Sequence, residues 1–168
     1  LADWNKAIEI NPNLAEAYVN RGVLYRLQEK YDLALSEYNQ AIDINPNYAM
    51  AYYNRGVLYR LQEKYDLALA DYDKAIELNR NFAEAYVNRG VLYFEQKKYE
   101  LALSDYNQAI DINPNLAQAY LGRGGLYAIL GQPEKAKIDL QQAAILFLQQ
   151  NNMAAYEKVM QILQQLGG

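Results

Sequence analysis

Apolar and small residues recur along this chain with the period of an amphipathic helix. In residues 15–48 they fall at intervals of three or four residues in two sets, Tyr18, Gly22 and Tyr25 followed by Ala34, Tyr38 and Ala41. This spacing predicts two helices, each with one apolar face. The polar segment 28–31 between them is a short turn, so we expect the two helices to pack as antiparallel neighbours.

The predicted hairpin repeats with a period of 34 residues, and residues 20–35 are identical to residues 54–69. Because a single hairpin cannot bury its apolar face alone, stacked repeats must share one core. The lack of an initiator Met and the half repeat at the start lead us to expect a piece of a longer protein. The predicted parts are residues 1–14 (second half of a repeat), 15–48, 49–82, 83–116, a divergent repeat 117–150, and a capping helix in 151–168.

The linkers between repeats read Asn-Pro-Asn at residues 11–13, 45–47 and 113–115. Proline cannot continue a helix, and we expect the Asn that follows it to cap the next helix. Glu16 stands three residues after Asn13, which is the spacing of a capping box. At the end of the chain we expect a helix over residues 152–166, with Met153, Tyr156, Met160 and Leu163 on its apolar face.

The repeat resembles the tetratricopeptide repeat family, in the bacterial type that carries Asn-Arg-Gly in its first helix. With the first Ala of Ala-x-Ala-Tyr as position 1, the family expects an aromatic residue at position 4 and small residues at positions 8, 20 and 27. The chain supplies them in every repeat: Tyr18, Tyr52, Tyr86 and Tyr120; Gly22, Gly56, Gly90 and Gly124; Ala34, Ala68, Ala102 and Ala136; Ala41, Ala75, Ala109 and Ala143. The resemblance implies an all-α fold, a right-handed α-solenoid of antiparallel helix hairpins, whose first helices line a concave inner face.

Composition narrows the range of functions. The chain has no Cys and no His, so it lacks a thiol nucleophile, the commonest general base and the commonest transition-metal ligand. We therefore expect no catalytic activity, no cofactor and no metal site. The net charge of −4, without a cluster of Lys and Arg, argues against nucleic acid as a partner. No apolar run approaches the roughly 20 residues that span a bilayer, so we expect no membrane insertion and a cytoplasmic location.

Position 6 of the repeat provides the most specific candidate for binding. Asn20, Asn54 and Asn88 occupy it, and Gly122 ends the row in the fourth repeat. A side-chain amide carries a donor and an acceptor, and can pair with the backbone of an extended peptide of any sequence. The alternative is that these amides bond within the scaffold or to water. Around the row, the resemblance places further candidate groove residues: Val23, Val57, Val91, Met50, Tyr53, Arg26, Arg60 and Phe94.

Two charged rows accompany the amide row. Position 7 is arginine in all four repeats and position 23 is acidic: Arg21, Arg55, Arg89 and Arg123, with Asp3, Glu37, Asp71, Asp105 and Asp139. An unpaired guanidinium beside a core is costly, so we interpret the two rows as a structural ion-pair ladder. Pairing within a repeat and pairing across a repeat boundary both remain open. The functional alternative is that the arginines capture an anion in the groove.

The prediction is a non-catalytic scaffold that binds a protein or an extended peptide on its concave face. The alternative is self-association through residues 1–10, where Trp4 and Ile8 would have no preceding helix to cover them. The best-known site of the family, a carboxylate clamp, is not expected. Of the places that it needs, only Asn54 fits, because Val19, Val23, Glu84 and Asn88 stand at the others.

Overall fold

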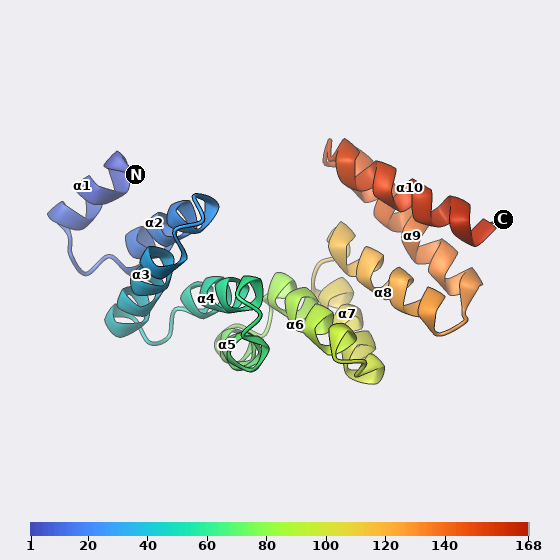
Figure 1. Ribbon diagram of the computed structural model, residues 1–168, viewed down its shortest axis with the longest axis horizontal. Helices are drawn as coiled ribbons and strands as arrows, with labels where there is room; N and C mark the ends of the chain where they lie inside the picture. The colour runs from blue at the N-terminus through green and yellow to red at the C-terminus, as the bar shows by residue number, and fades with distance from the viewer. Residues whose placement is uncertain (168) are drawn as a thin grey trace. The chain divides into compact units, whose positions relative to one another are not determined.

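The structure is a computed structural model that describes residues 1–167. Within these residues the chain forms ten α-helices and no strand (Figure 1). The helices group into two compact units, Leu1–Arg80 and Asn81–Gly168, each with its own buried core. The all-α fold of helical hairpins that the sequence predicts is therefore present.

The first unit consists of one helix and two hairpins. Helices α2 and α3 pack closely along each other, as do α4 and α5, and α4 also contacts both α2 and α3. The first helices of the two hairpins thus lie side by side, and α1 packs against α2 (Figure 1). The helices are α1 (Ala2–Ile10), α2 (Ala15–Leu27), α3 (Tyr31–Ile44), α4 (Ala49–Leu61) and α5 (Tyr65–Leu78).

The second unit repeats this arrangement and adds a final helix. Helix α6 pairs with α7 and α8 with α9, the first helices α6 and α8 touch, and α10 packs on α9 (Figure 1). The helices are α6 (Ala83–Glu95), α7 (Tyr99–Ile112), α8 (Ala117–Ile129), α9 (Pro133–Gln149) and α10 (Met153–Gly167).

Small residues allow the two helices of a hairpin to approach closely. Ala34, Tyr38 and Ala41 of α3 are completely buried, and Gly22 of α2 faces them. A Cβ on Gly22 would lie 2.6 Å from Cε1 of Tyr38. The tyrosine ring therefore occupies the space that a side chain at position 8 would need, which explains the glycine.

The turn within each hairpin is closed by a residue in the left-handed conformation. Glu29, Glu63 and Lys97 have φ of 59°, 60° and 58°, and Gly131 takes this place in the fourth hairpin with φ of 70°. After Glu29, the Lys30 N–H donates to the Tyr25 carbonyl at 2.9 Å, as at the end of a Schellman-type helix terminus. This local geometry reverses the chain and makes the helices antiparallel.

The linker asparagines act differently from the prediction. The Asn11 side chain accepts a hydrogen bond from the Asn13 N–H at 3.1 Å, and Asn45 and Asn113 make the same bond. These bonds close a turn directly after the preceding helix. The N-cap of α2 is Leu14, without a side-chain capping bond, so the expected Asn cap and the capping box with Glu16 are wrong.

Helix α10 covers the core of the last hairpin with a slightly different face from the one expected. Val159 is completely buried, and Tyr156, Met160 and Leu163 pack around the same cluster. Met153, in contrast, is 49% exposed and lies at the start of the helix, outside this cluster. The expected apolar row therefore starts one turn later and includes Val159.

Candidate functional site

The amide row lies on the first helices of the hairpins, α2, α4 and α6. Asn54 is only 8% exposed, and its Nδ2 donates to the Met50 carbonyl at 2.8 Å. Asn88 makes the same bond to Glu84 at 3.1 Å, while Asn20 is half-buried. One N–H of the Asn54 amide is thus used within its own helix. No donor in residues 1–167 reaches its Oδ1, so this acceptor is available to a ligand.

Several of the other predicted groove positions of α2 and α4 carry apolar side chains. Val23 of α2 and Val57 of α4 are half-buried, and Met50 is 39% exposed. Tyr53 packs against the buried Tyr72 of α5 with 6.1 Å between ring centroids. The first helices of this unit therefore carry half-buried apolar side chains together with a buried amide.

Arg26 and Arg60 stand in the last turns of α2 and α4, on the same unit. Both are half-buried, and in each case the buried Nε has no hydrogen-bond partner. The hydroxyl groups of Tyr38 and Tyr72 are also buried without a partner. Burial raises the pKa of Tyr38, and the neighbouring Arg26 guanidinium partly offsets this rise; Arg60 acts in the same way on the pKa of Tyr72.

The second unit has a hollow of about 320 Å³ on the corresponding face. Phe94 replaces the arginine here and packs on Tyr99 with 6.0 Å between ring centroids. The hollow brings together two predicted residues, Val91 and Phe94, with residues from α7 and α8. Its walls are Val91, Phe94, Glu95, Tyr106, Leu121, Gly122 and Gly125.

The ring of Tyr106 lies against Gly122, where the amide row ends. A Cβ on Gly122 would lie 2.6 Å from Cε1 and 2.7 Å from Cζ of Tyr106. An asparagine at this position would need the buried tyrosine to move. Tyr106 and Gly122 were not among the candidate site residues predicted from the sequence, although glycine at positions 6 and 9 of the fourth repeat, Gly122 and Gly125, was a visible signal.

The arginines of position 7 all pair with the acid of the same hairpin. Each guanidinium donates through two nitrogens to one carboxylate, the strong fork arrangement of Arg with Asp or Glu. The hydrogen bond to Asp71 raises the pKa of Arg55. Asp3 is exposed and takes no part in these pairs. The pairs are Arg21–Glu37 at 2.9 Å, Arg55–Asp71 at 2.8 Å, Arg89–Asp105 at 2.7 Å and Arg123–Asp139 at 2.7 Å.

The third nitrogen of these arginines reaches the preceding repeat. Nη1 of Arg55 donates to Oδ1 of Asn39 at 2.7 Å, and Arg21 and Arg123 bond Asn5 and Asn107 in the same way. The pair of one hairpin is thereby tied to the helix before it. Nε, Nη1 and Nη2 of Arg21, Arg55 and Arg123 thus all donate within the scaffold, which favours the predicted ion-pair ladder over capture of an anion.

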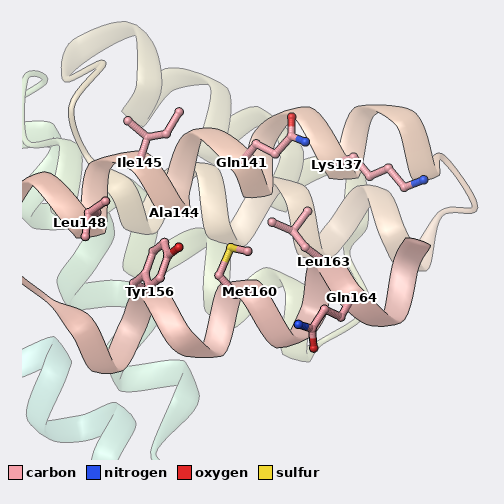
Figure 2. A pocket seen from close by; sticks show the side chains of 9 residues that line it. All are labelled: Lys137, Gln141, Ala144, Ile145, Leu148, Tyr156, Met160, Leu163 and Gln164. Atoms are coloured by element: carbon pink, nitrogen blue, oxygen red, sulfur yellow. The ribbon is translucent and has the colours of Figure 1, made fainter. Parts of the chain in front are cut away.

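A second hollow lies between α9 and α10 at the end of the second unit, with a volume of about 640 Å³. Figure 2 shows Tyr156, Met160 and Leu163 of α10 opposite Ile145 and Ala144 of α9. Ile145 is 52% exposed, so α10 covers the last hairpin only in part. The lining residues are mostly apolar, and Lys137, Gln141 and Gln164 are the polar ones.

Comparison with known proteins identifies the family. The models of the tetratricopeptide repeat match residues 4–36, 49–82, 83–116 and 105–138, and a further TPR repeat model matches residues 24–62. Together these matches cover residues 4–138 without a gap. The chain belongs to the tetratricopeptide repeat family. The predicted family and the predicted all-α fold of repeated hairpins are confirmed.

Several solved tetratricopeptide repeat structures resemble this one. The first TPR of Spaghetti (RPAP3), bound to the HSP90 peptide SRMEEVD, is 30% identical, with a TM-score of 0.66 over 70% of this chain and 93% of that one. MamA is 23% identical, with a TM-score of 0.73 over 88% and 86%, and Pseudomonas aeruginosa pilF is 21% identical, with a TM-score of 0.71 over 92% and 77%. Comparison with curated proteins gives no match.

Tetratricopeptide repeats are generally non-catalytic. This chain is a protein–protein interaction module. None of the helices in residues 1–167 combines the length and the apolar character needed to cross a membrane.

Proposed function

We propose that this chain is a non-catalytic scaffold that binds an extended segment of a partner protein on the face of its first helices. The observation that carries this proposal is the free Oδ1 of Asn54, set in a face of apolar side chains from α2 and α4. An acceptor held by its own helix is pre-organised for a backbone N–H of the partner. Apolar contacts to Val23, Val57 and Met50 supply further affinity.

The peptide-bound relative supports this proposal. The RPAP3 repeat domain, 30% identical to this chain, was solved with the peptide SRMEEVD. The residues of the family's carboxylate clamp are not repeated here, because Val19, Val23 and Glu84 stand at clamp positions. We therefore propose that this chain binds a different partner through a different set of side chains.

Removal of two amides of the row tests the proposal. A random-peptide library selected on the wild-type chain supplies binding peptides, and fluorescence anisotropy measures their affinity. Each lost hydrogen bond contributes about 0.5–1.5 kcal/mol, so Asn54→Ala with Asn88→Ala weakens binding by about fivefold or more. The melting temperature stays unchanged.

The matched control removes two amides from the linkers. Asn47 and Asn115 are exposed, and the hydrogen bonds that they make within residues 1–167 use their backbone atoms and not their side-chain amides. Asn47→Ala with Asn115→Ala therefore leaves the affinity unchanged. If the Asn54 and Asn88 double variant bound every selected peptide as tightly as the control variant, the assignment of this face would be wrong.

Self-association through α1 is the second candidate function. No residue of α1 is buried; Trp4 and Ile8 are half-buried, and Leu1 and Ile10 are 40% and 75% exposed. A second copy that docks on this helix would cover its apolar side chains. Sedimentation at increasing micromolar concentration tests it, and a strict monomer at all of them contradicts it.

A further inference from the structure

The hollow of about 320 Å³ in the second unit lies where the repeat sequence changes. Position 9 carries valine in the first three repeats and Gly125 in the fourth. A Cβ on Gly125 would meet nothing within 4 Å, so this glycine borders open space. Gly122, at position 6, stands where the first three repeats carry asparagine. The hollow is therefore open on the side of α8, because neither glycine puts a side chain into it.

The other walls are mostly apolar side chains. Val91 and Phe94 of α6 and Leu121 of α8 are half-buried, and all three line the hollow. The Phe94 ring packs on Tyr99 of α7 with 6.0 Å between ring centroids, which holds it in place. Fixed apolar walls of this kind can receive the carbon stem of a partner's side chain without rearrangement.

One wall residue is an acid, Glu95, and its side chain is exposed. It stands at position 13, directly after Phe94 at position 12. The other repeats have apolar residues at position 13, namely Leu27, Leu61 and Ile129. The first two repeats have arginine at position 12, Arg26 and Arg60. The third hairpin thus exchanges a cation on this face for an aromatic ring and an acid.

The Glu95 carboxylate has no partner within the described part of the chain. No ion pair or side-chain hydrogen bond of residues 1–167 includes it, although Lys97 and Lys98 follow in the next turn. Asp105 of the same hairpin, in contrast, is bound by Arg89 at 2.7 Å. Glu95 is therefore the acid of this hairpin whose charge is available to a ligand in the hollow.

We propose that this hollow is a receptor pocket for one lysine or arginine side chain of the partner segment, with the stem between α6 and α8 and the cation at Glu95. The proposal rests on the proposed function, because it names the chemistry of the segment that the first helices of the second unit bind. Long basic side chains bury their methylene groups along apolar surface and keep the charge at the water-exposed edge. The face of the Phe94 ring adds a further attraction for a cation.

A selection experiment tests the charge. The probe is a random-peptide library fused to the display protein at both ends, so that side chains provide its only cations. We expect wild-type protein to enrich Lys or Arg at one position of the peptide. Glu95→Gln loses this enrichment. Glu100→Gln retains it, because Glu100 is an exposed acid of the same unit that does not line the hollow, and its replacement changes the net charge equally.

Affinities of one selected peptide separate the cation from the stem. Replacing its basic residue by Met keeps an apolar stem and weakens binding to the wild type by about two- to fivefold, since the ion pair is exposed. Replacement by Ala weakens it by about tenfold or more, because the buried methylene groups are lost as well. In the Glu95→Gln variant the Met replacement has no effect.

Filling the hollow tests the place. Gly125→Val restores the residue that position 9 carries in the other repeats, in space that is open. We expect it to weaken the basic peptide by about tenfold or more, since it excludes the stem. The Ala-substituted peptide binds this variant as it binds the wild type. The melting temperature does not fall, because glycine is the poorer helix former.

The outcomes separate this inference from the proposed function. Selected peptides without a basic residue, including peptides with an aromatic or aliphatic residue in its place, overturn the inference and leave the peptide-binding scaffold intact. The same holds if Glu95→Gln and Glu100→Gln affect the basic preference equally, which would show a general attraction to an acidic protein. A folded Gly125→Val variant that binds the basic peptide as tightly as the wild type also overturns the inference alone. A wild-type protein that selects no peptide at all overturns both.

Discussion

At the scale of single residues, two adjacent glycines of α8 have opposite roles. A Cβ on Gly124 would lie 2.9 Å from Cγ of the buried Leu140 and 3.3 Å from the Ala136 carbonyl oxygen, whereas a Cβ on Gly125 would meet nothing within 4 Å. Gly124→Ala forces the hairpin apart and lowers the free energy of unfolding by about 1–3 kcal/mol. Gly125→Ala raises it by up to about 1 kcal/mol, because alanine favours the helix.

Urea denaturation of the two variants measures this difference directly. Each variant adds one methyl group to the same helix, so they control for each other. Equal effects of the two substitutions would contradict the packing argument. The repeat pattern indicates that Gly124 is a packing residue, since it stands at position 8, and gives no such reason for Gly125.

At the scale of helices, the bridge between Arg55 and Asp71 holds one hairpin together and links it to the previous one through Asn39. The Asp71 side chain is only 8% exposed, so Arg55→Met leaves a buried carboxylate unpaired. We expect the free energy of unfolding to fall by about 3–5 kcal/mol. Arg55→Met with Asp71→Leu recovers much of this loss, because no buried charge remains.

The control is the exposed pair Lys74–Glu77 on α5, which spans three residues of one helix. Lys74→Met changes the net charge as Arg55→Met does, and we expect an effect below about 0.5 kcal/mol. Thermal unfolding of the single and double variants gives the values. A loss in Arg55→Met no larger than in Lys74→Met would show that the ladder does not stabilise the fold.

Much of this element structure can be predicted from the sequence, because the repeat positions fix which residues face each other. Helical spacing alone predicts that Gly22 and Tyr38 are packing residues of the hairpin. The partner of Arg55 did not follow, since position 23 of two neighbouring hairpins offers an acid and only the helix geometry selects Asp71. The sequence also could not predict that the buried Tyr38 hydroxyl lacks a hydrogen-bond partner, because the repeat pattern identifies Tyr38 only as a core residue.

At the scale of the whole molecule, each hairpin buries part of its apolar surface against its neighbours. The local stability of a helix is therefore lower where a neighbour is missing. Helix α1 has no buried residue, whereas α9 contributes seven, among them Leu140 and Phe147. Amide hydrogen exchange of the dilute protein should therefore be much faster in α1 than in α9, because α1 opens locally while α9 opens only with its whole unit.

The same measurement at higher concentration separates the two candidate functions. If a second copy covers Trp4 and Ile8, association adds to the protection of α1 by mass action, and exchange there slows as the protein concentration rises. If the chain acts only as a peptide scaffold, α1 exchanges at the same rate at every concentration. A saturating selected peptide then slows exchange in α2 and α4, which carry Asn20 and Asn54, and leaves α1 unprotected. Protection of α1 equal to that of α9 in dilute solution would contradict the nearest-neighbour account of this fold.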